Sequence, residues 1–454
     1  MAVQGPLDTT ADVNETDQVN YLQNILDTSP QTPERVSALQ AFVDAHEKFM
    51  RFIPRYGIDI KETLVNHLMK IVYTLDETND KELSLVFASL KTLSRETRKS
   101  DPIFTKTFYR HCMKWSGLDI ANPKFVPIIM KEAAKCVVMI HMNGSEMDCM
   151  QFFMDMDGVT SVLNLFKDTS AYDDEVLFAH ARLLCLVSFP KQEEVYQASV
   201  KKLQELGCLQ IIGVYFEKLV KEFPAKRPKA LFEVLRIVFN LTVSLGALAK
   251  GEKESYEKVV PNFESLIKSS LQVLYATEKH VEVLQYKEQV VNCFLNIPTK
   301  FITIILQPKG ISQSEKTLGA LMELLEITLE RIPNECPIQL LMLLCCIAHN
   351  FVPAQRYFLE KMFPHRDLGV ELELEVGKPA VETAQKDYPC MGNKLIPFLM
   401  SLKEADKYFA NELMFQICGE NDKVFIKLVG FGPAAGQLAM RNMFGMGKYL
   451  DGGN

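Results

Sequence analysis

The strongest constraint on the fold is a series of apolar, helix-length segments that recurs along the chain. The clearest examples cover residues 178–188, 231–241, 289–297 and 340–350, and each ends near a polar residue. A helix such as 231–243 is apolar on most of its sides, so it needs neighbouring helices on more than one face. Stacked helix pairs supply such neighbours and leave a long concave surface along the stack.

The spacing of these segments supports a repeat architecture. Their centres are roughly 45–55 residues apart, and armadillo and HEAT repeats are about 40–47 residues long. The segments 156–166 and 205–215 can be laid over each other so that Gly158 and Gly207 coincide, each at the start of a predicted helix. We therefore predict an all-α fold, an armadillo/HEAT-like helical repeat superhelix with a concave binding groove.

Interruptions of the helical pattern suggest the domain limits. Residues 1–17 are polar and are expected to form a mobile N-terminal segment. Residues 18–445 are expected to form a single repeat domain with a long loop at about 364–392, in which residues 370–376 alternate apolar and acidic side chains. Residues 446–454 are expected to be the remnant of a C-terminal tail.

Composition disfavours several classes of partner. The 454 residues carry a net charge of −7, which argues against a bulk electrostatic grip on nucleic acid or on an anionic membrane. No apolar run reaches the roughly 18 residues that a membrane span requires, so we expect no direct membrane insertion. The eleven cysteines are scattered without a C-x-x-C pair, and the N-terminus does not resemble a signal peptide. Both observations indicate a reducing, cytoplasmic location.

The sequence offers little for covalent chemistry. Eight histidines are dispersed without metal-binding spacing, and no nucleophile elbow or Cys/His dyad stands out, so we expect no catalytic residue, no metal and no cofactor. One alternative is a dinucleotide site at Gly430, Gly432 and Gly436, which follow the β-prone residues 424–429. That fingerprint requires a second strand with an acidic residue about 20 residues further on, and the few residues around Asp451 cannot supply it.

Polar residues inside otherwise apolar helices are the best candidates for binding. Asn240, Asn292 and Asn296 lie in such helices, where an amide side chain needs a hydrogen-bonding partner. Inward-facing asparagines of this kind can clamp the main chain of a bound segment. Lys91 and Arg95 share one helix face at i, i+4, and such cations can bind a terminal carboxylate. The alternative for these two residues is an ordinary solvated helix face.

The C-terminal region resembles a known family. Residues 425–441, Phe-Ile-Lys-Leu-Val-Gly-Phe-Gly-Pro-Ala-Ala-Gly-Gln-Leu-Ala-Met-Arg, are similar to the signature F-I-K-Y-T-G-Y-G-N-A-A-G-L-L-A-A-R of the synembryn family. Further similar blocks occur in the same order at residues 90–95, 235–242, 291–298 and 392–395. The signature residues are Phe425, Lys427, Gly430, Phe431, Gly432, Gly436 and Arg441.

The resemblance implies a superhelix that acts on α subunits of heterotrimeric G proteins (Gα). It implies chaperoning of nascent Gα, and guanine-nucleotide exchange on GDP-bound Gα through a nucleotide-free intermediate, without covalent chemistry. The groove would grip the C-terminal helix of Gα and loosen its nucleotide site. The protein would be cytoplasmic and recruited to the cell cortex or plasma membrane through Gα. The groove residues predicted on this basis are Lys91, Arg95, Phe178, Arg236, Phe239, Asn240, Asn292, Asn296 and Lys300.

The chain also departs from the family pattern. Lys91 replaces an arginine, and Met139 stands where the family has a groove asparagine. The acidic tail of the family is missing after the signature, so binding of Gα is expected to survive better than exchange.

The turn in the signature is expected to require a positive φ at Gly432. The alternative function is an armadillo-type scaffold that binds another peptide or a small GTPase without exchange activity.

Overall fold

The computed structural model describes residues 15–46, 57–74, 79–95, 97–119, 124–143, 148–189, 191–248, 260–297, 306, 311–364 and 390–441. All regular secondary structure in these ranges is helical, which confirms the predicted all-α fold. The chain divides into two compact units, and the expected single domain 18–445 stays a prediction. Unit 1 comprises Met1–Tyr215 and Pro228–Ser244, and unit 2 comprises Phe216–Arg227 and Leu245–Asn454.

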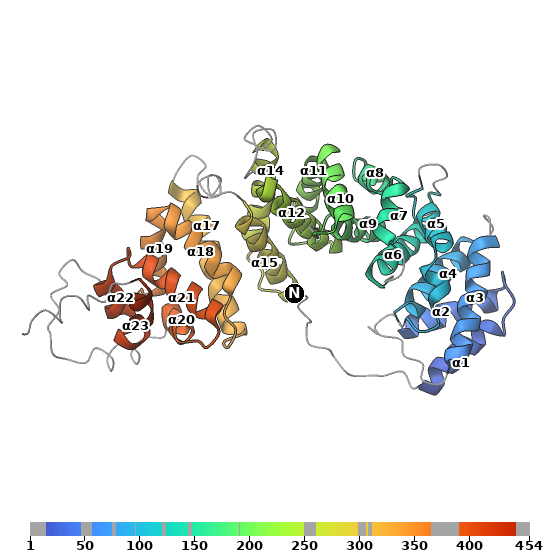
Figure 1. The fold of residues 1–454 in the computed structure, drawn as a ribbon, viewed down its shortest axis with the longest axis horizontal. Coiled ribbons are helices and arrows are strands. Elements are labelled where there is room, and N and C mark those ends of the chain that lie inside the picture. Colours follow the sequence, from blue (N-terminus) through green and yellow to red (C-terminus); the bar gives the residue numbers. More distant parts are fainter. Residues whose placement is uncertain are drawn as a thin grey trace, which may run out of the picture. The chain divides into compact units, whose positions relative to one another are not determined.

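Unit 1 is a succession of helices, drawn from blue to green in Figure 1. Its elements are α1 (Glu15–Leu26), α2 (Pro33–His46), α3 (Ile58–Thr74), α4 (Asp80–Leu93), η1 (Asp101–Phe104), α5 (Lys106–Trp115), α6 (Pro127–Asn143), α7 (Cys149–Asp155), α8 (Gly158–Leu165), η2 (Thr169–Ala171), α9 (Asp174–Val187) and α10 (Glu194–Glu205). Helices α11 (Cys208–Val220) and α12 (Lys229–Leu248) begin in unit 1, and their last residues belong to unit 2.

A row of helices forms the centre of unit 1. Helix α4 packs on α2, α3 and α6, and α6 packs in turn on α5 and α9. Because α4 has neighbours on several faces, the consecutive residues Leu85, Val86 and Phe87 are at most 8% exposed although they point in different directions around the helix. The apolar segments 178–188 and 231–241 lie in α9 and α12. This packing is the stacking expected of helical repeats, whereas the concave groove stays a prediction.

The local sequence explains where several helices begin. Asp173 precedes α9, and its side chain accepts a hydrogen bond from the backbone N–H of Val176 at 2.8 Å. Thr105 precedes α5 and accepts one from the backbone N–H of Phe108 at 3.3 Å. Such caps satisfy N–H groups that have no partner within the first turn of a helix.

The predicted correspondence between Gly158 and Gly207 is wrong by one residue. Gly207 has a φ of +71° between α10 and α11, but the left-handed residue between α7 and α8 is Asp157, with a φ of 55°. Gly158 is the first residue of α8 and is needed for a different reason, because a Cβ there would lie 2.3 Å from the ring of Phe153. The two turns therefore repeat in backbone conformation, while their glycines serve different purposes.

Unit 2 is a second set of packed helices (Figure 1). Helix α18 packs on α15, α19 and α21, and α21 packs on α20, α22 and α23. The apolar segments 289–297 and 340–350 fall at α15 and α18. The elements are α14 (Val260–Leu274), α15 (Val281–Leu295), α17 (Ile311–Arg331), α18 (Ile338–Asn350), α19 (Val352–Met362), α20 (Met391–Leu399), α21 (Glu404–Ile417), α22 (Asp422–Val429) and α23 (Phe431–Met440).

Two predicted boundaries shift. Helix α1 begins at Glu15, so residues 15–17 are helical and do not belong to a mobile segment. Helix α20 begins at Met391, so residues 391–392 are helical and do not belong to the long loop. The remaining residues of the expected mobile segment, loop and tail, 1–14, 365–389 and 446–454, lie outside the described residues.

Candidate functional site

Five charged side chains form an ion-pair ladder across four helices of unit 1. Lys91 of α4 contacts Glu132 Oε2 of α6 at 2.9 Å, and Lys135 of α6 contacts Glu132 Oε1 at the same distance. Lys135 also lies 3.9 Å from Glu175 of α9, which pairs with Lys229 of α12 at 2.9 Å. The ladder shows that these four helices present one common face.

Three further predicted residues extend this face. The ammonium group of Lys229 lies 6.0 Å from the ring centre of Phe178, which is half-buried on α9. Arg236 follows Lys229 by about two turns of α12 and donates to Glu233 at 3.1 Å. Phe239, about one turn further on, is half-buried as well. We define the charged face as the ladder residues Lys91, Glu132, Lys135, Glu175 and Lys229 together with Phe178, Arg236 and Phe239.

Both carboxylates of the ladder are stabilised in their ionised form. Burial raises the pKa of Glu132, but the ammonium groups of Lys91 and Lys135 outweigh it and hold that pKa below its ordinary value. The pKa of Glu175 is lowered chiefly by the hydrogen bond from Lys229. At neutral pH the three ammonium groups and two carboxylates therefore leave a single net positive charge on the ladder.

Arg95 follows Lys91 by four residues and lies in the turn just after the end of α4. Its Nη1 donates to the backbone carbonyl of His46 at 2.9 Å, so it ties the turn after α4 to the end of α2. Lys91 and Arg95 therefore each have a partner inside unit 1. Their contact with a carboxylate of another protein stays a prediction.

Asn240 is buried, with 3% of its surface exposed. Its Nδ2 donates to the backbone carbonyl of Cys185 at 3.0 Å and to the hydroxyl of Ser188 at 3.1 Å. The side chain was expected to clamp the main chain of a bound segment, and in this structure it clamps the main chain of α9. Asn240 thus fixes the spacing of two helices that carry the charged face.

The remaining predicted groove residues belong to unit 2. Asn292 is half-buried on α15. Asn296 caps the C-terminus of α15, and its buried Nδ2 has no hydrogen-bond partner within the described ranges. Lys300 lies outside the described residues. The structure therefore leaves the binding role of these three residues a prediction.

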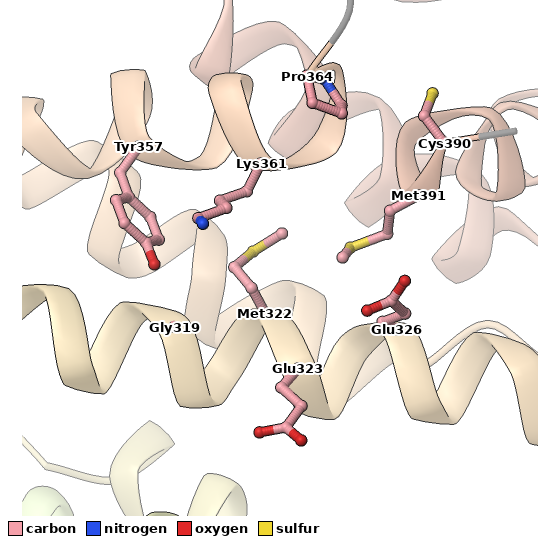
Figure 2. Close-up of a pocket in the computed structure, with 9 residues that line it drawn as sticks. All are labelled: Gly319, Met322, Glu323, Glu326, Tyr357, Lys361, Pro364, Cys390 and Met391. Atoms are coloured by element: carbon pink, nitrogen blue, oxygen red, sulfur yellow. The ribbon is translucent and has the colours of Figure 1, made fainter. Parts of the chain in front are cut away.

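Unit 2 also contains a cleft of about 310 Å³ between α17, α19 and the start of α20 (Figure 2). Met322 and Met391 line it with thioethers, while Lys361 and Glu326 bring opposite charges to its walls. None of the residues predicted for the groove or the signature is among its described lining. The other lining residues are Gly319, Glu323, Tyr357, Pro364 and Cys390.

The signature residues form the helix pair α22 and α23. Because residues 424–429 lie within α22, the β-strand that a dinucleotide fingerprint requires is missing, and that alternative is wrong. Phe425 is fully buried, and its ring packs edge-on against Phe415 of α21 with 5.5 Å between ring centres. Phe431 is 56% exposed at the start of α23. Lys427 and Gly436 are exposed, and Arg441 is half-buried.

The turn between α22 and α23 depends on Gly430. This residue has φ of 86° and ψ of 158°, a conformation that essentially only glycine adopts. Gly432 lies in the first turn of α23 without a positive φ, and a Cβ there would meet nothing within 4 Å. The prediction of a positive φ at Gly432 is therefore wrong by two residues.

Sequence reasoning missed four of the five ladder residues. Glu132 and Lys135 are spaced i, i+3, and this pattern could have indicated a pair on one helix face. Glu175 and Lys229 give no such signal, because their partners lie on other helices. Only the packing of α6, α9 and α12 brings these charges together.

The stacked helices and the charged face define a helical-repeat protein, a class whose extended surfaces bind other proteins. The chain belongs to the synembryn family, because the family model described as "Ric8: Guanine nucleotide exchange factor synembryn" matches residues 86–451. This match confirms the family resemblance of the signature.

The chain is similar in sequence to curated relatives and in structure to solved proteins. "Chaperone Ric-8A" of Gallus gallus is 22% identical over 383 residues, covering 79% of this chain and 69% of the relative. "Chaperone Ric-8A" of Xenopus tropicalis is 22% identical over 382 residues with the same coverage. A structure from a study of a phosphorylation switch between cadherin and beta-catenin covers 88% of this chain and 80% of its own, with 10% identity and a TM-score of 0.44.

Proposed function

We propose that this protein is a chaperone and a non-receptor guanine-nucleotide exchange factor for α subunits of heterotrimeric G proteins. The observation that carries the proposal is the family match over residues 86–451, which contains the whole signature segment 425–441. Relatives that cover most of the chain are named chaperones, which agrees with the first half of the proposal. The same match favours this function over a general scaffold.

The charged face of unit 1 is the part of the protein that we assign to Gα. Half-buried Phe178 and Phe239 offer apolar contact, while Lys91, Lys229 and Arg236 supply cations on the charged face. This combination suits an amphipathic helix that ends in a carboxylate. The face would bind the C-terminal helix of GDP-bound, nucleotide-free or nascent Gα.

Exchange would follow from binding alone. A ligand shifts a conformational equilibrium by as much as it prefers one state over the other. If the charged face binds the Gα helix better when that helix is displaced, the loosened state gains population and GDP leaves faster. No covalent step by this protein is required.

The protein would act in the cytoplasm and reach the cell cortex through its partner. In the described part of the chain, no helix combines the length and the apolar character needed to cross a bilayer. Attachment to the membrane through Gα would therefore be indirect.

Uptake of GTPγS by purified Gα tests the proposal. The protein should accelerate uptake, and it should capture GDP-loaded and nascent Gα in a pull-down. Deleting the last helical turns of Gα should reduce both effects. Equal capture of intact and shortened Gα, without acceleration, would instead indicate a scaffold with a different docking site.

A further inference from the structure

Glu132 lies between two lysines of the charged face and uses both carboxylate oxygens on them. Lys91 donates to Oε2 and Lys135 donates to Oε1, each at 2.9 Å. The side chain of Glu132 is only 10% exposed, so water can replace these contacts only in part. The contact with Lys91 also bridges α4 and α6.

Glu132 holds the two lysines in place but does not use all of their N–H donors. An ammonium group has three donors, and Lys91 and Lys135 each direct one of them at Glu132. Their side chains are 18% and 25% exposed, which fits stems buried along the helices with charged ends at the surface. A carboxylate from another protein can reach these ends, but there it meets the negative charge of Glu132.

We propose that Glu132 is an internal competitor for the carboxylate of a bound Gα segment. It thereby sets how strongly the charged face distinguishes an acidic segment from a neutral one. In the free protein Glu132 occupies Lys91 and Lys135, and in the complex the carboxylate of the partner shares or takes over these lysines. The inference rests on the proposed function for the identity of the partner. The single net positive charge of the ladder matches one carboxylate and not a polyanion.

Glu175 is a weaker competitor. Its side chain is 41% exposed and that of its partner Lys229 is 67% exposed, so water screens this pair. Lys135 lies 3.9 Å from Glu175 but 2.9 Å from Glu132. The competition is therefore concentrated at Glu132.

Glu132 also has an opposite effect, because it orders the two lysines and so reduces the entropy lost on binding. Removing its charge would end the competition and strengthen binding of a carboxylate, but it would also loosen the lysines. The largely buried stems of Lys91 and Lys135 limit that loosening. Repulsion between two partly screened carboxylates a few ångströms apart corresponds to about a fivefold change in affinity, so the competition prevails.

Fluorescence anisotropy tests the inference on the full chain. The probe is a labelled peptide with about three C-terminal helical turns of Gα, prepared once with a free carboxylate and once amidated. The variants are Glu132→Gln and Glu132→Ala. Both should bind the free-acid peptide about fivefold more tightly than the unchanged protein does. The affinity for the amidated peptide should change less than twofold.

The matched control is Glu205→Gln, which removes one exposed carboxylate at the end of α10, a helix that carries no ladder residue. It should alter neither affinity, and thermal melting checks that all variants are folded. Two results would overturn the inference. One is an equal change in affinity for both peptides in the Glu132 variants, and the other is no gain in affinity for the free-acid peptide. If the unchanged protein binds neither peptide, the assignment of the charged face to Gα is wrong as well.

Discussion

The guanidinium carbon of Arg441 lies 4.4 Å from the ring centre of Phe415. The same guanidinium donates to Glu412 Oε2 at 2.5 Å, and Gln437 Nε2 lies 3.4 Å from that oxygen. Arg441 ends the family signature, and Phe415 and Glu412 belong to α21. The last residue of the signature therefore fastens the α22–α23 pair to the helix before it.

Replacing Arg441 by Ala should destabilise unit 2. The loss of the cation–π contact and of a partly buried ion pair should lower the free energy of unfolding by about 1–2 kcal/mol. Arg441→Lys should keep part of the stability that Arg441→Ala loses, because the charge remains while the planar stacking on Phe415 is lost. Denaturant unfolding measures both variants. Curves that coincide with that of the unchanged protein would show that the contact contributes nothing.

Gly430 and Gly432 give a matched pair for the signature turn. Gly430→Ala forces a side chain into a backbone conformation reserved for glycine and should cost about 1–3 kcal/mol of stability. Gly432→Ala places a methyl group in open space on a helix and should be neutral or stabilising by up to about 1 kcal/mol. Thermal melting of the two variants decides the assignment. A larger loss at Gly432 than at Gly430 would contradict it.

This pair also shows how far the sequence could predict the fold. The glycine-containing turn after Val429 and the helical repeat were visible in the sequence, because punctuation and apolar periodicity are local signals. The choice between Gly430 and Gly432 was not, because both fit a turn and only the backbone path decides which one has a positive φ. The sequence also placed α9 and α12 correctly from their apolar content.

The charged face was predicted only in part for a related reason. Lys91 and Arg236 could be recognised on helix faces, and the family resemblance pointed to them. The pairing of Lys91 with Glu132 could not be foreseen, because Glu132 is 41 positions away in sequence and lies on another helix. Asn240 was recognised as a clamp, but the pattern could not tell whether the clamped chain belongs to a partner or to α9.

Replacing Asn240 by Ala should weaken unit 1 strongly. The change removes two hydrogen bonds from a buried amide and leaves the carbonyl of Cys185 without this donor, which should cost about 2–3 kcal/mol. Asn143→Ala is the control, since Asn143 makes a longer 3.3 Å bond to Ser94 from a half-buried position and should cost about 1 kcal/mol or less. Denaturant unfolding should rank the two in that order. Equal losses of stability would mean that the hydrogen bonds of Asn240 between α9 and α12 contribute no more than the single bond of Asn143.

His141 should make the protein less stable in mild acid. Burial lowers its pKa to about 4, and its Nε2 lies 2.7 Å from the hydroxyl of Tyr109. In the unfolded chain the pKa is about 6.5, so only the unfolded state binds the proton between these values. The free energy of unfolding should therefore fall as the pH drops from about 6.5 to 4, by at most about 3 kcal/mol.

The variant His141→Gln isolates this contribution, because glutamine can accept the Tyr109 hydrogen bond without titrating. The difference in unfolding free energy between the two proteins should change across pH 6.5 to 4 and stay constant above pH 7. Unfolding curves at several pH values give that difference. A pH-independent difference would show that His141 binds its proton equally well in both states.

Reversing the charge of Lys91 should weaken binding of Gα by more than tenfold. Lys91→Glu removes a cation from the charged face and places a second carboxylate beside Glu132, so the partner meets repulsion where it met attraction. The double variant Lys91→Glu with Glu132→Lys restores the ion pair in the opposite order and keeps the net charge. It should fold like the unchanged protein and recover affinity to within about threefold, because Lys135 and the new lysine then flank the site. Titration calorimetry with GDP-loaded Gα measures both variants, and unchanged affinity in the single variant would remove Lys91 from the binding site.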